Sequence, residues 1–348
     1  MRYFDEQLIA NHPRQHGAWW EDVCVDREYF HQTEEAFASL RNSSAILPRD
    51  AWQDLDDITR RVMRSDEGQV YMQDLMALAK PVHIGKLVHL NRVSSDAGTV
   101  FRSMSGQVPV ALDKVAYDYR GTPVPIFATG YGREWREWNT LQSENIDALG
   151  DDQEAHNAKL RRNMALYVLD GDPDIVVGGY TAYGIRTSPL SKPVELGASG
   201  ANIDLSDPST TSDEIDEFFS IFFGAILDAN LMTQKINVYV SPEIGRRLDL
   251  TYSGSAGYKG GSLLSYLLTN RRINKIAVTY ELTGNSFFAF VPSQEYIRPL
   301  VGMAVNTTAK TRLNPTDNYQ FLVMGAMGIE IRGDYNNKSG VFYSRVTP

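Results

Sequence analysis

The order of apolar and polar positions first becomes regular in residues 82–119. Apolar residues alternate with polar ones on both sides of a flexible middle, at Val82, Ile84, Val88 and Leu90 before it and at Val108, Val110 and Leu112 after it. A period of two is typical of β-strands, and the serines and glycines of residues 94–106 favour turns. The pattern predicts an extended two-stranded arm. Because an isolated ribbon is only marginally stable in water, the arm indicates a surface for a partner.

A long amphipathic helix is predicted after the arm, at residues 134–169. Its apolar positions recur among charged and amide side chains, at Trp138, Leu141, Leu149, Leu160, Met164 and Val168. About 36 residues at 1.5 Å each would extend about 54 Å. Asp170, Gly171 and Pro173 predict its end, because glycine tolerates the left-handed conformation and proline cannot continue a helix. Gly150 weakens the middle, so we expect a bend or break at residues 150–152.

The second half of the chain predicts a mixed sheet covered by helices. The predicted helices are residues 213–230 with Ser212 as the N-cap, 243–248 and 263–269, and the predicted strands are 236–240, 275–280, 287–291, 321–324, 328–332 and 341–345. Helices alternating with such apolar strands are typical of an α+β fold. The first eighty residues predict an arm with short helices.

Composition and charge limit the class of protein. The chain has 348 residues, of which 43% are hydrophobic, so it can bury a substantial core. A formal net charge of -9 opposes sequence-independent binding to nucleic acid. Residues 235–348 hold 13 Lys or Arg against 7 Asp or Glu, whereas residues 1–234 hold 21 against 36. This asymmetry favours head-to-tail contact between copies, although two solvated surfaces of different composition would give the same counts.

The single cysteine, Cys24, excludes an intramolecular disulfide and favours a reducing compartment. The N-terminal residues lack the basic and then apolar pattern of a secretory signal. The most apolar stretch, residues 218–227, has about half the length that a bilayer crossing requires. We therefore expect a cytoplasmic protein that does not contact a membrane.

Two stretches resemble ligand-binding motifs but depart from them. Residues 253–262 contain the glycines and the lysine of a phosphate loop, yet no Gly-Lys-Ser or Gly-Lys-Thr occurs, so we expect a mobile loop there. Asp170, Asp172 and Asp174 alternate like calcium ligands, but the twelfth position of the motif is a threonine instead of glutamate. A helix end is the favoured interpretation of these aspartates.

Metal and nucleophile motifs are equally incomplete. A four-ligand zinc site could be assembled from His12, His16, Cys24 and His31, but their spacing matches no common structural site. His83 and His89 are expected to share a strand face and to contact solvent or a neighbouring subunit. No Gly-x-Ser-x-Gly elbow occurs, and the acidic residues around Cys24 would raise the pKa of its thiol. The sequence predicts no catalytic residue, no metal ligand and no cofactor.

Four local phrases recur in a meaningful order: Val124-Pro125-Ile126-Phe127 before the long helix, Asp170-Gly171-Asp172-Pro173 at its end, Val238-Tyr239-Val240-Ser241-Pro242 before a short helix, and Met327-Gly328-Ile329-Glu330-Ile331-Arg332 near the C-terminus. Together with the order of elements, they resemble the major capsid proteins of tailed double-stranded DNA bacteriophages, which have the Hong Kong 97-type fold. The resemblance covers most of the chain after about residue 80, and it depends on layout more than on any single phrase.

The resemblance implies an α+β Hong Kong 97-like capsid fold with an N-terminal arm (residues 1–80), an extended loop (81–121), a peripheral domain with a spine helix (122–179 and 303–348) and an axial domain (180–302). It implies a structural protein, not an enzyme, whose pentamers and hexamers form an icosahedral shell enclosing double-stranded DNA without sequence-specific contact. The implied partners are further copies of the chain and scaffolding, portal and decoration proteins. The implied locations are the virion capsid and, during assembly, the host cytoplasm. An encapsulin-type nanocompartment shell and a hydrolase with an unrecognised site are the alternatives.

Overall fold

The structure is a computed structural model of the chain. It describes residues 68–98, 100–105, 113–143, 148–254, 257–312 and 314–347. The chain divides into two units, Met1–Met63 and Arg64–Pro348, and all described residues belong to the second. The candidate zinc ligands His12, His16, Cys24 and His31 lie outside the described residues, as does most of the predicted N-terminal arm.

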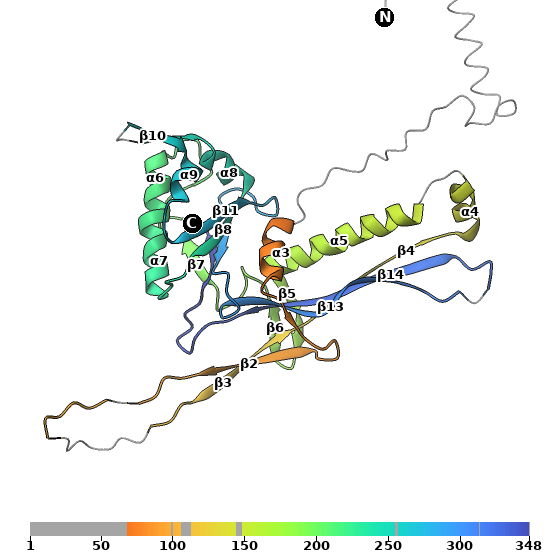
Figure 1. The fold of residues 1–348 in the computed structure, drawn as a ribbon, viewed down its shortest axis with the longest axis horizontal. Helices are drawn as coiled ribbons and strands as arrows, with labels where there is room; N and C mark the ends of the chain where they lie inside the picture. Colours follow the sequence, from red (N-terminus) through yellow and green to blue (C-terminus); the bar gives the residue numbers. More distant parts are fainter. Residues whose placement is uncertain are drawn as a thin grey trace, which may run out of the picture. The chain divides into compact units, whose positions relative to one another are not determined.

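A four-stranded sheet with one long helix forms the first part of this unit. The strands, in spatial order, are β1 (Lys80–Pro81), β13 (Ile297–Ala309), β14 (Tyr319–Ile331) and β4 (Ile126–Arg133). Strand β14 runs antiparallel to β13 and β4, whereas β1 is parallel to β13. Helix α5 (Ala148–Asp170) lies along this sheet (Figure 1), and its Leu160 and Met164 share a buried cluster with Val323 and Met327 of β14.

A five-stranded sheet forms the second part. Its strands, in spatial order, are β11 (Ile273–Val278), β8 (Ile236–Val240), β12 (Phe287–Phe290), β15 (Val341–Arg345) and β7 (Lys192–Glu195). Every residue of β8 and β12 is buried, as expected for strands covered on both faces. One face packs against α6 (Ser212–Glu217), the π-helical turn η2 (Phe218–Phe222), α7 (Phe223–Ala229), α8 (Pro242–Leu248) and α9 (Leu263–Leu267).

The other face of the five-stranded sheet is aromatic and joins the two sheets into one core. The rings of Tyr239 and Phe288 stack there with centroids 5.0 Å apart. Helix α3 (Gln69–Met76) lies against them, and its Tyr71 meets the Phe288 ring edge-on at 5.3 Å. The Tyr71 hydroxyl donates a hydrogen bond of 2.8 Å to the carbonyl oxygen of Ala165 in α5. Tyr71 therefore contacts both α5 and the five-stranded sheet.

A polar contact at the edge of this core fixes the position of α3 against the five-stranded sheet. The carboxylate of Asp74 pairs with Lys275 of β11 at 2.8 Å and accepts a hydrogen bond from the hydroxyl of Tyr239. Burial and this carboxylate raise the pKa of Tyr239 well above its usual range, so the hydroxyl stays protonated and remains a donor. Residues 69–76 fell within the predicted arm, but they form a helix with two fully buried side chains, Tyr71 and Leu75.

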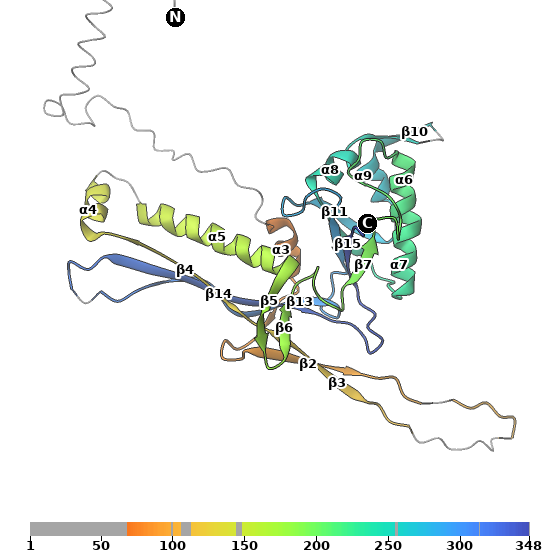
Figure 2. The same cartoon turned by 180° about the vertical axis from the view of Figure 1, so that it is seen from behind.

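A two-stranded ribbon extends away from both sheets (Figure 1, Figure 2). It consists of β2 (Val88–Ser94) and β3 (Tyr117–Pro123), paired antiparallel from Val88 opposite Pro123 to Ser94 opposite Tyr117. The sequence placed the first strand from Val82, but the Val82 amide donates to Val301 of β13, so this residue extends the four-stranded sheet. The predicted return leg at residues 108–112 lies outside the described residues.

A second hairpin, β5 (Gly171–Val177) with β6 (Tyr180–Tyr183), packs against the base of the ribbon. The Tyr180 ring lies so close to the backbone of β3 that a Cβ on Gly121 would stand 2.6 Å from it. Only glycine fits there without displacing the tyrosine.

The long predicted helix is described as two helices, α4 (Trp135–Ser143) and α5, with residues 144–147 outside the described residues. Gly150 lies within the first turn of α5, so the break expected at residues 150–152 is wrong. The predicted end is confirmed, because α5 ends at Asp170 and Gly171 adopts the left-handed conformation with φ 68°.

Two further predictions need correction. The N-cap of α6 is Thr211 instead of Ser212, because the Thr211 hydroxyl accepts from the Glu214 amide while the Glu214 carboxylate accepts from the Thr211 amide. The glycine-rich stretch expected to be a loop forms two antiparallel strands, β9 (Thr251–Gly254) and β10 (Gly257–Ser262). The strand at residues 236–240 and the helix after Ser241 are confirmed, and Ser241 caps α8.

The sheets bear on the expected division into peripheral and axial domains. Strand β13 crosses the expected boundary between residues 302 and 303. Strand β15, near the C-terminus, pairs with β12 and β7 in the five-stranded sheet. The division into domains by residue numbers stays a prediction. The two sheets suggest where its boundaries would move, because β13 spans one boundary and β15 pairs with the other sheet.

Helix α3 gives a direct test of the shared core. Leu75→Ala removes a fully buried side chain, so the free energy of unfolding should fall by about 2–5 kcal/mol. Met76, the next residue, is 44% exposed, and Met76→Ala should change it by less than about 0.5 kcal/mol. Urea titrations of both variants measure the difference. Equal losses would show that α3 does not belong to the core.

Candidate assembly surfaces

The end of the ribbon exposes apolar side chains that no described part of the chain covers. Met104 is fully exposed, Val100 is 87% exposed and Phe101 is 45% exposed. Beside them, the Gly98 amide donates to the carboxylate of Asp113 at 3.1 Å. Covering three such side chains would contribute about 1.5–3 kcal/mol each. The sequence predicted a partner surface here because the arm lacks a core of its own. The exposed side chains of Val100, Phe101 and Met104 are the residues that would form this surface.

The base of the ribbon is firmly attached to the rest of the unit. Arg120 of β3 donates to the carbonyl oxygens of Gly333 and Asp334, each at 3.3 Å, and to Oδ1 of Asn337 at 2.9 Å. The Val124 amide donates to Leu87 at 3.0 Å. These bonds fix the direction of the ribbon while its far end carries the exposed apolar residues.

A buried charge cluster lies under the same base. Glu330 of β14 is 1% exposed and forms a two-bond ion pair with Arg298 of β13, at 2.7 and 3.4 Å. Nδ1 of His89 on β2 stands 3.6 Å from the same carboxylate, and Arg332 lies 3.7 Å from it. On its other side, Nε2 of His89 is 3.2 Å from Nζ of Lys80. The cluster joins β1, β2, β13 and β14.

The sequence predicted that His89 contacts solvent or a neighbouring subunit, but within this chain its ring lies between Glu330 and Lys80 and has little contact with solvent. Its side chain is 17% exposed, and burial lowers the pKa of the imidazole more than Glu330 raises it. The positively charged ammonium group of Lys80, next to Nε2, also favours the neutral imidazole. In that form the proton is on Nδ1, which faces the carboxylate of Glu330. His83, the other histidine expected on that face, is exposed and accepts from the Gly85 amide at 3.0 Å.

The cluster left a weak signal in the sequence. Glu330 stands between Ile329 and Ile331, and Arg298 follows Ile297, so each charge interrupts an apolar strand. Two isolated opposite charges in neighbouring apolar strands indicate a buried pair, since an unpaired charge there would be costly. Sequence reasoning missed it because the pairing of the two strands was not predicted.

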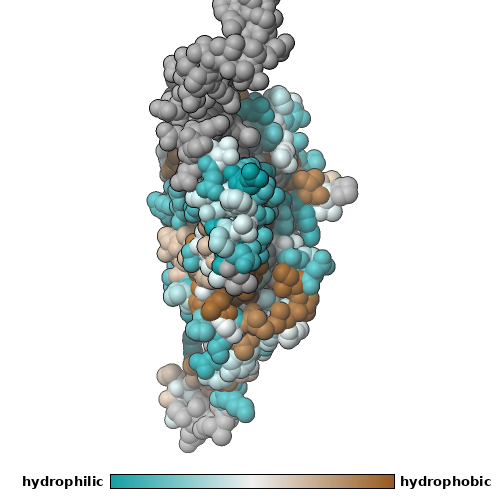
Figure 3. Space-filling model, turned by 90° about the vertical axis from the view of Figure 1, so that its right-hand side faces the viewer, coloured by the Kyte–Doolittle hydropathy of each residue, from teal (hydrophilic) through white to brown (hydrophobic). Residues whose placement is uncertain are grey.

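The face of the four-stranded sheet opposite α5 is a second candidate surface. Phe127 and Tyr131 of β4 point toward α5, where they meet the rings of Tyr167 and His156. The alternate positions face outward: Ile126, Ala128, Gly130 and Gly132. Ile126 is 58% exposed. On the side of the molecule that carries the β13–β14 hairpin, apolar residues gather in a patch in the lower half of the view (Figure 3).

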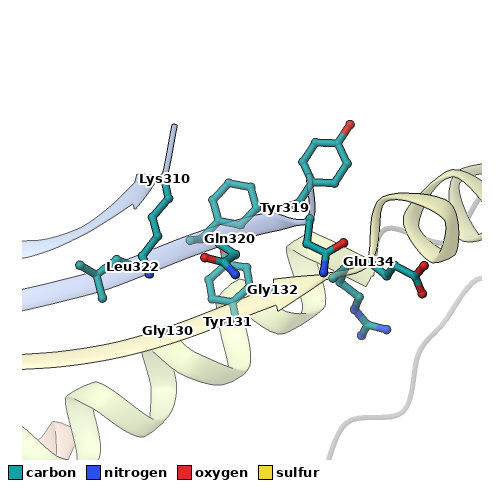
Figure 4. A pocket seen from close by; sticks show the side chains of 11 residues that line it. Gly130, Tyr131, Gly132, Glu134, Lys310, Tyr319, Gln320 and Leu322 are labelled. Carbon is teal, nitrogen blue, oxygen red and sulfur yellow. The ribbon is translucent and has the colours of Figure 1, made fainter. Parts of the chain in front are cut away.

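A pocket of about 400 Å³ lies over the ends of β4 and β14. Gly130 and Gly132 line it on one strand, and Figure 4 shows Lys310, Gln320 and Tyr319 along it. The lack of side chains at the glycines lets another chain approach the sheet closely. This sheet end is also rigid, because Arg133 pairs with Asp152 of α5 at 2.6 Å and with Glu137 at 2.8 Å.

The candidate motifs within the described residues do not assemble into a chemical site. Asp170 forms an ion pair with Arg186 at 2.7 Å, and Asp172 accepts from the Asp174 amide at 3.1 Å. Lys259 lies on strand β10 and not at the start of a helix, so the phosphate-loop geometry is absent there. Among the described residues, no group of three or more His, Cys, Asp or Glu side chains could hold a metal ion. No helix in the described part of the chain has the length and apolarity needed to span a membrane.

The fold is that of the capsid proteins of tailed phages. The structure resembles the capsid of Myoviridae phage XM1 with a TM-score of 0.66, at 11% identity over 88% of this chain and 100% of that chain. It resembles the capsid of the native GTA particle with a TM-score of 0.57 (11% identity, 85% and 95% covered) and a structure of Mycobacterium phage Bobi with a TM-score of 0.57 (9% identity, 86% and 97% covered). The predicted α+β Hong Kong 97-type fold is confirmed.

Within that fold class, the sequence defines a narrower group. Residues 42–344 match the family of unknown function DUF6260, and the chain belongs to this family. No curated protein sequence matches the chain.

The buried histidine makes stability depend on pH. The pKa of His89 in the folded state is below its ordinary value of 6.5. As the pH falls, the unfolded state therefore binds a proton before the folded state does. The contribution of His89 to the free energy of unfolding is fully present above about pH 6.5 and is lost as the pH falls toward the folded pKa. We expect His89→Gln to lose less unfolding free energy than the wild type between about pH 7.5 and pH 5.5. Denaturant titrations at both pH values measure this, with exposed His83→Gln as the control. A loss in His89→Gln equal to that of the wild type would contradict the assignment.

Proposed function

We propose that this protein is a phage major capsid subunit, which assembles into pentamers and hexamers of an icosahedral shell enclosing double-stranded DNA. The observation that carries the proposal is the ribbon, whose base is fixed and whose far end exposes Val100, Phe101 and Met104. A monomer gains nothing from this arrangement, whereas a closed shell covers every ribbon. The capsid-type fold supports the same conclusion.

In the proposed shell, the ribbon end of one copy lies on the outer sheet face of the next. That face offers Ile126 and the glycine-lined pocket at the ends of β4 and β14. An apolar loop on an apolar sheet face removes both surfaces from water. At about 1.5–3 kcal/mol for each covered side chain, one contact is modest, but a ring of copies repeats it and the shell repeats the ring. Each contact alone is weak enough to form and break during early assembly. The sum of many such contacts makes the closed particle stable.

The proposed domains follow the two sheets. Residues 122–179 and 303–348 without β15 are the peripheral domain with α5 as its spine helix, and the four-stranded sheet of this domain also takes in β1 and residues 297–302 of β13. Residues 180–302 form the axial domain, to which the sheet pairing of β15 adds the C-terminal strand. Residues 81–121 are the extended loop and residues 1–80 the N-terminal arm, except that α3 belongs to the core.

The proposed partners are other copies of the chain and scaffolding, portal and decoration proteins. Packaged DNA would be enclosed without sequence-specific contact, since a net charge of -9 opposes tight binding to phosphates. The role is structural and not enzymatic, in the virion capsid and in the host cytoplasm during assembly. An encapsulin-type shell would use the same contacts around an enzyme cargo. The phage and GTA capsids among the similar structures favour the capsid.

Shortening the ribbon tests this function. Ser95 and Ala116 still pair across it, with the Ser95 amide 2.8 Å from the Ala116 carbonyl oxygen. Residues 97–114 can therefore be replaced by Gly-Gly as a two-residue hairpin turn. We expect the variant to keep its circular dichroism spectrum and melting temperature, because none of the described residues that are removed is buried, and to form no closed shells in sedimentation velocity.

A length-preserving variant separates loss of apolar contact from loss of reach. The triple substitution of Val100, Phe101 and Met104 by Ser should also prevent shells. Normal particles from the shortened chain would refute the proposed role of the ribbon.

A further inference from the structure

A groove of about 630 Å³ follows the outer side of α6, η2 and α7. Its floor is apolar, formed by Ile203, Phe218, Ile221, Phe222 and Ala225. The groove belongs to the five-stranded-sheet unit and is distinct from the ribbon and from the outer face of the four-stranded sheet.

The π-helical turn shapes this groove. In η2 the helix takes one extra residue in its turn, which shifts the faces of the helix on either side. Phe218 and Phe219 are buried against Phe287 of the sheet, whereas Ile221 is 65% exposed. A π-turn is rare and often marks a functional position. Here it presents an isoleucine to solvent beside two half-buried or buried phenylalanines.

The rim of the groove is acidic. Asp204, Glu214 and Glu217 line it, and no Lys or Arg does among the described residues. Asp204 binds Ser206 and Glu214 belongs to the capping box of α6. Glu217 is exposed and has no hydrogen bond or ion pair within the described part of the chain. An occupant of the groove would combine an apolar group with a positive charge.

The chain itself carries such a pair at the C-terminal end of α8 and just beyond it. Arg246 is exposed and forms no ion pair or hydrogen bond with any described residue. Leu250 is 49% exposed and lies two residues beyond the end of α8, where its amide donates to the carbonyl oxygen of Arg247 at 3.3 Å, so it stays close to the last turn that carries Arg246. Their neighbourhood is apolar as well, because Val278 of β11 packs against Gly245 of α8.

Within one copy, Arg247 of α8 reaches the edge of the groove, where it donates to the carbonyl oxygen of Thr210, whereas Arg246 points about 100° away around the helix. Helix α8 lies on the other side of α9 from α6 and α7 (Figure 1). The groove and the Arg246 surface also come from the two parts of the chain that differ in charge. The groove is formed by residues of the acidic part, 1–234, and Arg246 belongs to the basic part, 235–348. Two different surfaces of one chain that complement each other form a head-to-tail contact, which closes into a ring when the rotation allows.

We propose that the acidic groove on α6–η2–α7 binds the Arg246–Leu250 pair of a second copy, with Leu250 on the apolar floor and Arg246 beside Glu217. This contact rests on the proposed shell function and specifies how copies join around a ring. The ribbon and the groove then hold different neighbouring surfaces.

A charge exchange tests the pairing. Glu217→Arg and Arg246→Glu should each slow assembly of the full chain about tenfold at low salt, since each places like charges together. The double variant should assemble within about threefold of the wild type, because the pair is restored in reverse. Asp174→Arg on β5, an exposed acid away from the groove, controls for the change in net charge. Light scattering gives the rates and circular dichroism checks that each variant folds.

The outcomes separate this inference from the function on which it rests. Single variants as fast as the wild type, or a double variant no faster than the single ones, would overturn the pairing while shells still form. Slow assembly of Glu217→Arg with normal assembly of Arg246→Glu would give the groove a different occupant and also overturn it. A wild-type chain that never assembles would overturn the shell function, and this contact with it.

Discussion

The burial of one aromatic surface determines how the parts of this unit are placed. Tyr239, Phe288 and Phe290 cover one face of the five-stranded sheet, and they are fully buried only because α3 and α5 lie against them. Tyr71 provides the direct link, with its ring on Phe288 and its hydroxyl on the carbonyl oxygen of Ala165. Loss of this contact would expose the aromatic face and free the two sheets from each other. The position of the ribbon relative to the five-stranded sheet depends on it.

Rigidity at the centre explains why the apolar residues at the periphery matter. The ribbon base is tied by Arg120 and rests on the buried Glu330 cluster, so the ribbon cannot fold back to cover its own end. The groove beside η2 is bounded by packed phenylalanines and does not close on itself. In the proposed shell, the surfaces that a rigid subunit cannot cover alone are covered by its neighbours.

The sequence predicted local elements where side chains act on their own backbone. Gly171 ends α5 and Ser241 caps α8, because both effects operate within a few residues. The order of elements also predicted the fold class. The sequence did not predict α3, whose burial depends on a sheet more than 150 residues later in the chain. It placed His89 in contact with solvent or a neighbouring subunit for the same reason, since Glu330 approaches it only through the pairing of distant strands. The partner surface at the ribbon end could be predicted from its missing core, but the acidic groove could not, because it arises from the packing of η2 and residues 201–210.

Electron cryo-microscopy of the full chain, produced with each candidate scaffolding protein from its gene neighbourhood, tests the central claim most directly. The account predicts closed icosahedral shells in which the ribbon of each subunit lies on the outer sheet face of a neighbour, near Ile126 and the glycines of β4. A homogeneous monomer under these conditions would contradict it, as would shells whose ribbons extend into solvent with Val100, Phe101 and Met104 uncovered.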